Sequence, residues 1–219
     1  MMVKIQYLGS GIEVINYPEE EITLDDDPKR TVVWITSKAE TVVNRKATLI
    51  KERRGQFISE CIDIENLLGK AISNFFFETD SEKRELFHIF LLDTITISFK
   101  QKENLLRLIM EKHPEKFTLI SPTQRQEMIT KINDLIKKRN AFAHGKIVID
   151  FEAKETALIF YNNRDDKIEK LPLTEQLFSE LDKHVVSVCQ TLLQLFPSDC
   201  ATSISYGCVR IDQFFEGKL

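Results

Sequence analysis

Residues 123–146 read TQRQEMITKINDLIKKRNAFAHGK, and this stretch decides the fold prediction. Apolar side chains recur in it at three- and four-residue steps, the spacing of one face of an α-helix. These positions are Met128, Ile129, Ile132, Leu135, Ile136 and Phe142. A helix with such a stripe must bury it against other elements. We therefore expect residues 123–144 to form one member of a helical bundle.

Other segments of the chain carry the same helical period. They are residues 37–77, residues 81–113 in two pieces, and about 174–196. Ser37 and Glu40 match a capping box at the start of the first segment. Gly55 is expected to break or kink that segment, because glycine costs about 1 kcal/mol in a helix interior.

Two regions favour extended structure instead of helix. At the N-terminus, VKIQYL, GIEVINY and TVVWIT are partly alternating or rich in β-branched residues. The acidic run EEEITLDDD at 19–27 is expected to be a solvated loop, with an acidic flap over a basic site as the alternative. Residues 147–173 contain short strand-like runs around the turn sequence NNRDD and are expected to form an inserted β-hairpin.

The predicted fold is therefore mainly α: a bundle of four or five helices with an inserted β-hairpin and an extended N-terminal segment. We predict an extended or β segment at 1–36, a helical domain at 37–197 and an irregular tail at 198–219. The 219-residue length allows a well-packed core, and 42% hydrophobic with 29% charged residues is typical of a folded globular protein.

Composition disfavours several classes of function. No run of about 18 apolar residues and no export signal is present, so we expect a cytoplasmic protein with no membrane partner. The four cysteines form no CxxC pair and keep no ligand spacing with the histidines, so neither a disulfide framework, a metal nor a cofactor is expected. The net charge of −4 argues against a nonspecific nucleic-acid coat but allows a local basic site.

Arg139 is the anomaly of the 123–144 helix. With Ile132 set at zero, Arg139 falls at about 340°, near the centre of the apolar face. A guanidinium cannot lose its proton, so burying one without a partner costs several kcal/mol. Arg139 therefore needs a carboxylate, a subunit interface or a bound anion.

Asn140 and His144 lie one helical turn apart and can contact the same ligand or substrate group. Arg139 and His144 differ by about 140° around the helix and about 7.5 Å along it. Two antiparallel copies meeting across a twofold axis would bring both residues of both chains into one cleft. Two guanidinium groups, two imidazoles and two amides would suit a phosphodiester.

The sequence RNAFAH at 139–144 resembles the signature of HEPN domains: an arginine, a polar residue, three more and a histidine. Ala143 before the histidine, Gly145 after it and ISFKQKENLL upstream are similar to the usual surroundings of that signature. The resemblance covers about residues 38–196. It implies an α-helical bundle that homodimerises through the 123–144 helix, and in many members a metal-independent endoribonuclease of the toxin or antiviral-defence type.

The resemblance implies a role for each motif residue. Arg139 would orient the scissile phosphate, His144 would act as general acid or base, and Asn140 would hold the phosphate or the histidine. The RNA 2′-OH would be the nucleophile, leaving a 2′,3′-cyclic phosphate. An antitoxin or other regulatory protein would be a further partner. Weaker candidates for contact with the RNA backbone are Lys137, Lys138 and Lys146.

Two alternatives stay open at this point. One is a non-catalytic HEPN-like module that binds a nucleotide, RNA or a protein, with Arg139 and His144 holding an anion or stabilising the dimer. The other is a helical interaction protein in which Arg139 only pairs with a buried acid. For each lysine, simple solvation at the surface is the alternative.

Overall fold

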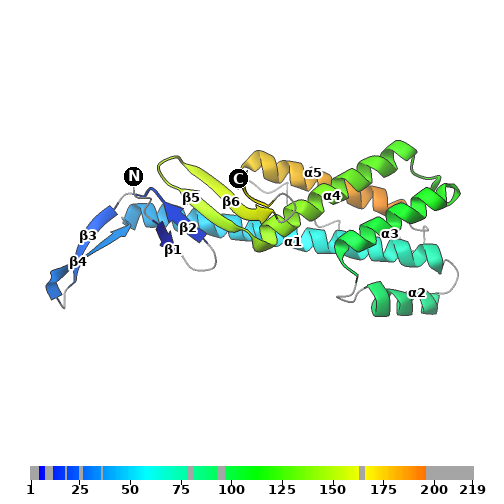
Figure 1. Cartoon of the computed structure of the whole chain (residues 1–219), viewed down its shortest axis with the longest axis horizontal. Coiled ribbons are helices and arrows are strands. Elements are labelled where there is room, and N and C mark those ends of the chain that lie inside the picture. The colour runs from blue at the N-terminus through cyan, green and yellow to red at the C-terminus, as the bar shows by residue number, and fades with distance from the viewer. Residues whose placement is uncertain are drawn as a thin grey trace, which may run out of the picture. The chain divides into compact units, whose positions relative to one another are not determined.

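The computed structural model describes residues 5–7, 12–17, 19–24, 27–35, 37–77, 81–92, 97–162 and 166–195. As predicted, the chain is mainly helical (Figure 1). The helices are α1 (Ser37–Phe76), α2 (Ser81–Phe87), α3 (Phe99–Lys112), α4 (Pro122–His144) and α5 (Glu175–Leu193), with a π-helical turn η1 (His88–Leu92) and a 3-10 turn η2 (Pro114–Phe117). The predicted tail at 198–219 lies outside the described residues.

The chain divides into two compact units. Residues 1–56 and 140–178 form the first, which we call the sheet unit, and residues 57–139 and 179–219 form the second, the bundle unit. Helices α1, α4 and α5 contribute residues to both units. The predicted boundaries at residues 36 and 197 stay a prediction.

The sheet unit contains one mixed sheet and one separate pair of strands. The strands are β1 (Ile5–Tyr7), β2 (Ile12–Ile15), β3 (Glu19–Leu24), β4 (Asp27–Ile35), β5 (Lys146–Asp150), β6 (Glu155–Asn162) and β7 (Lys167–Pro172). The mixed sheet has the order β1-β2-β5-β6-β7, in which β2 and β5 are parallel and the other pairs antiparallel. Among the strands that the structure describes, β3 and β4 form a separate two-stranded sheet with each other.

The predicted hairpin at 147–173 is thus a three-stranded meander, and it continues into the N-terminal strands. Ile12 lies opposite Ile147 and Val14 opposite Ile149, and all four side chains are buried. Asn16 Nδ2 also donates to Asp150 Oδ2 at 2.9 Å. Apolar residues alternate in the same way on β2 and β5, and this alternation buries one face of each strand. The predicted hairpin therefore covers only part of the sheet.

The acidic run at 19–27 is not the loop that we expected. Residues 19–24 form β3, and Asp27 begins β4, with Ile22 opposite Val32 in the antiparallel register. A dense run of acids indicates contact with water, but it does not distinguish a solvated loop from a solvated strand. The pairing partner at 27–35 decides between them.

Gly55 does not break α1, which runs from Ser37 to Phe76. Ile50 on one side and Phe57 on the other are both buried. Their burial is worth about 1.5–3 kcal/mol each, which exceeds the cost of one glycine in the helix.

The bundle unit is built around apolar side chains from four helices. The most completely buried are Ile64, Leu68 and Ile72 of α1, Leu106 of α3, Ile132 and Leu135 of α4, and Val185, Val188 and Leu192 of α5. Polar bonds also join neighbouring helices: Lys102 Nζ lies 3.1 Å from Glu65 Oε1 between α3 and α1. Among the helices described, none is long and apolar enough to span a membrane.

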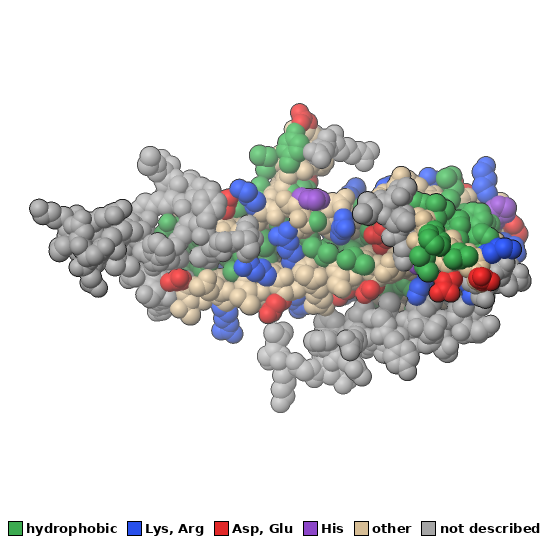
Figure 2. Space-filling view, turned by 90° about the horizontal axis from the view of Figure 1, so that it is seen from below, with side chains coloured by type: hydrophobic (Ala, Val, Ile, Leu, Met, Phe, Trp, Pro, Cys, Tyr) green, Lys and Arg blue, Asp and Glu red, His purple; other side chains and the backbone are tan. Residues whose placement is uncertain are grey.

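Hydrophobic side chains also gather on the surface over α2 and η1 (Figure 2). They are Leu86, Ile89, Phe90 and Leu91, of which Phe90 is 72% exposed. Phe76 and Phe87 continue this apolar region, with ring centroids 5.7 Å apart.

Candidate functional site

Both ends of α4 have local signals that set its length. At the start, Gln124 N–H donates to Ser121 Oγ at 3.2 Å and Ser121 N–H donates to Gln124 Oε1 at 2.8 Å, which is a capping box. At the end, Gly145 N–H donates to Ala141 O at 2.7 Å. A Cβ on Gly145 would lie 2.7 Å from that oxygen and 2.8 Å from Leu158 Cγ, so only glycine fits where the chain enters β5.

The apolar stripe of α4 is buried as predicted. Met128, Ile129, Ile132, Leu135, Ile136 and Phe142 are all in the core. The chain itself covers this stripe, so it is not available to a second copy. The ridge of α4 left open to a partner is polar, and its exposed residues include Glu127, Thr130, Lys137, Asn140 and His144.

Arg139 is half-buried and lies near α1 of the bundle unit. The pKa of the Cys61 thiol is raised to about 12, mainly by burial and also by the negative charges of Glu60 and Glu65. The positive charge of Arg139 acts in the opposite direction and lowers this pKa. Arg139, Glu60 and Glu65 therefore all influence the Cys61 thiol, and the alternative in which Arg139 pairs with a buried acid stays a prediction.

Asn140 and His144 are both exposed on the sheet-unit end of α4. They are separated by four residues, which places them on one edge of the helix about 6 Å apart along its axis. Neither depends on a loop for its position, because Ala141 and Phe142 between them are buried. The imidazole and the amide are accessible to a ligand from the same side.

Arg54 of α1 supports this end of α4, a contact that the sequence did not suggest. Its Nη2 donates to the Ala143 carbonyl oxygen at 3.0 Å, within the sheet unit. The last carbonyls of a helix have no partner inside it, and a cation there is favoured by the helix dipole. Arg54 thus holds the turn that carries His144.

The predicted RNA-contacting lysines have different surroundings. Lys137 is exposed and Lys138 is half-buried. Lys146 Nζ lies 2.7 Å from Glu13 Oε1 of β2. The ion pair partly neutralises Lys146, which weakens the argument that this lysine contacts RNA.

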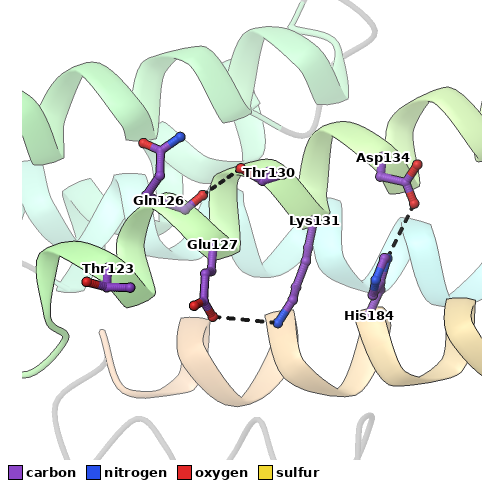
Figure 3. A pocket seen from close by; sticks show the side chains of 7 residues that line it. All are labelled: Thr123, Gln126, Glu127, Thr130, Lys131, Asp134 and His184. Carbon is purple, nitrogen blue, oxygen red and sulfur yellow. Dashed lines mark hydrogen bonds and ion pairs between the residues drawn. The ribbon is translucent and has the colours of Figure 1, made fainter.

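A groove of about 560 Å³ runs between α4 and α5 within the bundle unit (Figure 3). Its charged side chains face one another across or along it. Lys131 Nζ lies 4.0 Å from Glu127 Oε2, and His184 Nδ1 lies 3.3 Å from Asp134 Oδ2. Lys131 Nζ also donates to Ser187 Oγ at 2.8 Å. Glu127 offsets Lys131, and Asp134 faces His184, so the groove has no excess of positive charge.

The part of the chain that the structure describes has no group of three or more His, Cys, Asp or Glu side chains placed to hold a metal ion. Comparisons with protein-family models, curated proteins and solved structures found no match for this chain. Arg139, Asn140, His144 and their surroundings are therefore the features that bear on function.

Proposed function

We propose that this chain is a metal-independent endoribonuclease of the toxin or defence type, which cleaves RNA at a composite site in a homodimer. The observation that carries the proposal is the exposure of Asn140 and His144 on one edge of α4, directly after the half-buried Arg139. These are the residues of the HEPN-like RNAFAH motif, and they combine a permanent cation, an amide and a group for proton transfer.

In the proposed reaction, one imidazole takes the proton of the 2′-OH while its oxygen attacks the adjacent phosphorus. The bond from phosphorus to the 5′ oxygen breaks, and an imidazolium gives that oxygen a proton. The products are a 2′,3′-cyclic phosphate and a 5′-OH. Arg139 stabilises the negative charge that develops on the phosphate oxygens, and the Asn140 amide donates to one of them.

The need for two copies follows from the geometry of one helix. Arg139 and His144 of one α4 are about 140° apart around the helix, so they do not point at one spot. An antiparallel α4 from the partner subunit brings a second set of the same groups. The polar ridge with Asn140 and His144 is the face through which the two copies would meet.

The proposal is tested by end-group analysis of RNA treated with wild-type, His144→Ala and Arg139→Ala proteins. Both variants should stay folded and lose cleavage by about 100-fold or more, and EDTA should have no effect. His113→Ala is the matched control, because His113 is also exposed but pairs with Glu115 at 3.4 Å, away from the motif. Full activity in His144→Ala would overturn the proposal.

A second candidate is a non-catalytic HEPN-like module that binds a nucleotide, RNA or a protein. Glu60 favours it, because this carboxylate and Arg139 both influence the Cys61 thiol, so negative charge is already present in the surroundings of Arg139. Stoichiometric binding with no cyclic-phosphate product over a broad RNA panel would support this candidate over the nuclease.

A further inference from the structure

A second hollow, of about 350 Å³, lies wholly within the sheet unit. Its walls come from α1, from the start of β6, and from the end of β7 with the start of α5. The lining residues are Lys46, Leu49, Ile50, Arg53, Lys154, Glu155, Thr156, Pro172, Leu173, Thr174, Glu175 and Phe178. Its size lies within the range of sites for small organic ligands.

The charges of this pocket differ from those of the groove in Figure 3. Lys46 and Arg53 are seven residues apart and so lie on one face of α1, and Lys154 adds a third cation. In the described ranges, none of these three has a side-chain hydrogen bond or ion pair. Glu155, on the wall, is engaged by Lys170 at 2.8 Å. Positive charge is therefore in excess, with Glu175 as the remaining acid.

Apolar side chains form another part of the pocket lining, beside the cations. Leu49, which is half exposed, Pro172 and Phe178 all line the pocket. A flat apolar group can lie against such side chains while an attached anion reaches the cations. A nucleoside phosphate has both parts, since its base stacks on apolar surfaces and its phosphate takes bonds from arginine and lysine.

The pocket packs against the buried face of α4, in the same unit as the turn that carries His144. Phe178, in its lining, packs on Phe142 with ring centroids 6.0 Å apart, and Phe142 and His144 are about 200° apart around that helix. On the other wall, Arg53 precedes Arg54, whose guanidinium holds the Ala143 carbonyl. All of these residues belong to the sheet unit, so pocket and motif end are linked by direct packing.

We infer that this pocket binds one nucleoside phosphate unit of single-stranded RNA and anchors the strand to the unit that carries His144. The inference rests on the proposed function and names the part of the substrate that the chain recognises. Lys46 and Arg53 bind the phosphate, Lys154 adds to the attraction, and the apolar wall takes the base or sugar. The site is sequence-tolerant, because every base offers a flat face to such a wall.

The test measures binding of a fluorescein-labelled single-stranded 12-mer RNA by anisotropy, in the His144→Ala protein so that the probe stays intact. Lys46→Gln/Arg53→Gln is compared with Arg45→Gln/Lys51→Gln. The control pair removes the same charge from exposed positions of the same helix that do not line the pocket. Circular dichroism and melting temperature verify that both doubles are folded.

We expect the pocket double to weaken binding about tenfold or more and the control double less than about threefold. Loss of the contacts to this one phosphate should also reduce the slope of log K against log salt by about 0.7. Equal weakening by both doubles would overturn the inference, because only surface charge would then matter. No weakening by either double would overturn it too.

A second arm uses free AMP in place of RNA. If Lys46→Gln/Arg53→Gln loses AMP binding but keeps RNA binding, the pocket takes a free nucleotide and its role with RNA is overturned. Absence of cleavage by wild-type protein would defeat the proposed nuclease and leave this binding result standing. Conversely, cleavage that does not change in the pocket double would defeat the pocket alone.

Discussion

The pKa of the Cys61 thiol depends on the groups that surround this side chain. Cys61 is 1% exposed on α1, and burial, aided by Glu60, raises its pKa from 9.0 to about 12, although Arg139 opposes the shift. The sequence places Cys61 within the apolar helical period of α1, where a small buried hydrophobe fits. It did not predict that Arg139 of α4 would act on the same atom, because the two residues are 78 positions apart (139 − 61).

The raised pKa predicts a pH dependence of stability. Below about pH 9 the thiol keeps its proton in both folded and unfolded chains, so it does not make the free energy of unfolding depend on pH. Between about pH 9 and 12 only the unfolded chain loses the proton, and the free energy of unfolding should fall by about 1.4 kcal/mol per pH unit from this group. Urea unfolding of wild type and Cys61→Ala from pH 7 to 10.5 measures it. An equal slope in both proteins would contradict the prediction.

Gly145 and Gly55 predict opposite effects of the same substitution. Gly145→Ala should destabilise by about 1–3 kcal/mol, because the new Cβ would meet the Ala141 carbonyl oxygen and the Leu158 side chain. Gly55→Ala should stabilise by about 0.5–1 kcal/mol, since it lies inside α1 with nothing within 4 Å of a Cβ. Thermal melting of both variants measures the difference. Similar shifts in the same direction would contradict this account.

At the scale of the element, α1 and α3 are tied by a buried ion pair. Lys102 is 3% exposed, and its Nζ lies 3.1 Å from Glu65 Oε1, which is itself partly solvated. Glu65→Gln removes the anion and leaves a buried ammonium. We expect a loss of about 2–3 kcal/mol, whereas Lys102→Met should cost less than about 1 kcal/mol because the apolar stem is kept.

The matched control for that pair is Glu111→Gln. It breaks the Arg107–Glu111 pair of α3, whose side chains are 41% and 54% exposed, by the same chemical change. Exposed pairs contribute about 0–1 kcal/mol, so the control should change the free energy of unfolding little. If Glu111→Gln lowered the free energy of unfolding as much as Glu65→Gln does, burial of the Lys102–Glu65 pair would not explain the effect of Glu65→Gln.

Elements with a clear helical period were the most predictable. The predicted helix at 123–144 is α4 at Pro122–His144, and the predicted helix at about 174–196 is α5 at Glu175–Leu193. Their buried stripes repeat every three or four residues, and caps or proline mark their ends. Strands were less predictable, because a strand such as β3 becomes evident only through its partner.

At the scale of the whole molecule, the proposed composite site predicts that activity depends on protein concentration. If one protomer holds only half of the catalytic groups, specific ribonuclease activity per protomer should fall on dilution, in parallel with the loss of dimer. Mass photometry and a cleavage assay over the same dilution series measure the two curves. Constant specific activity in a sample shown to be monomeric would contradict a shared site.

By itself, the sequence determined which segments are helical, which faces of them are apolar, and that Arg139, Asn140 and His144 follow one another along one helix. Those properties depend on the spacing of residues along the chain, because helix geometry fixes which side chains lie on the same face of the helix. The tertiary structure alone decided that β2 pairs with β5, that Arg139 influences the Cys61 thiol of α1, and that Arg54 holds the end of α4. These are contacts between residues far apart in the chain, and they depend on how all the buried surfaces fit together at once.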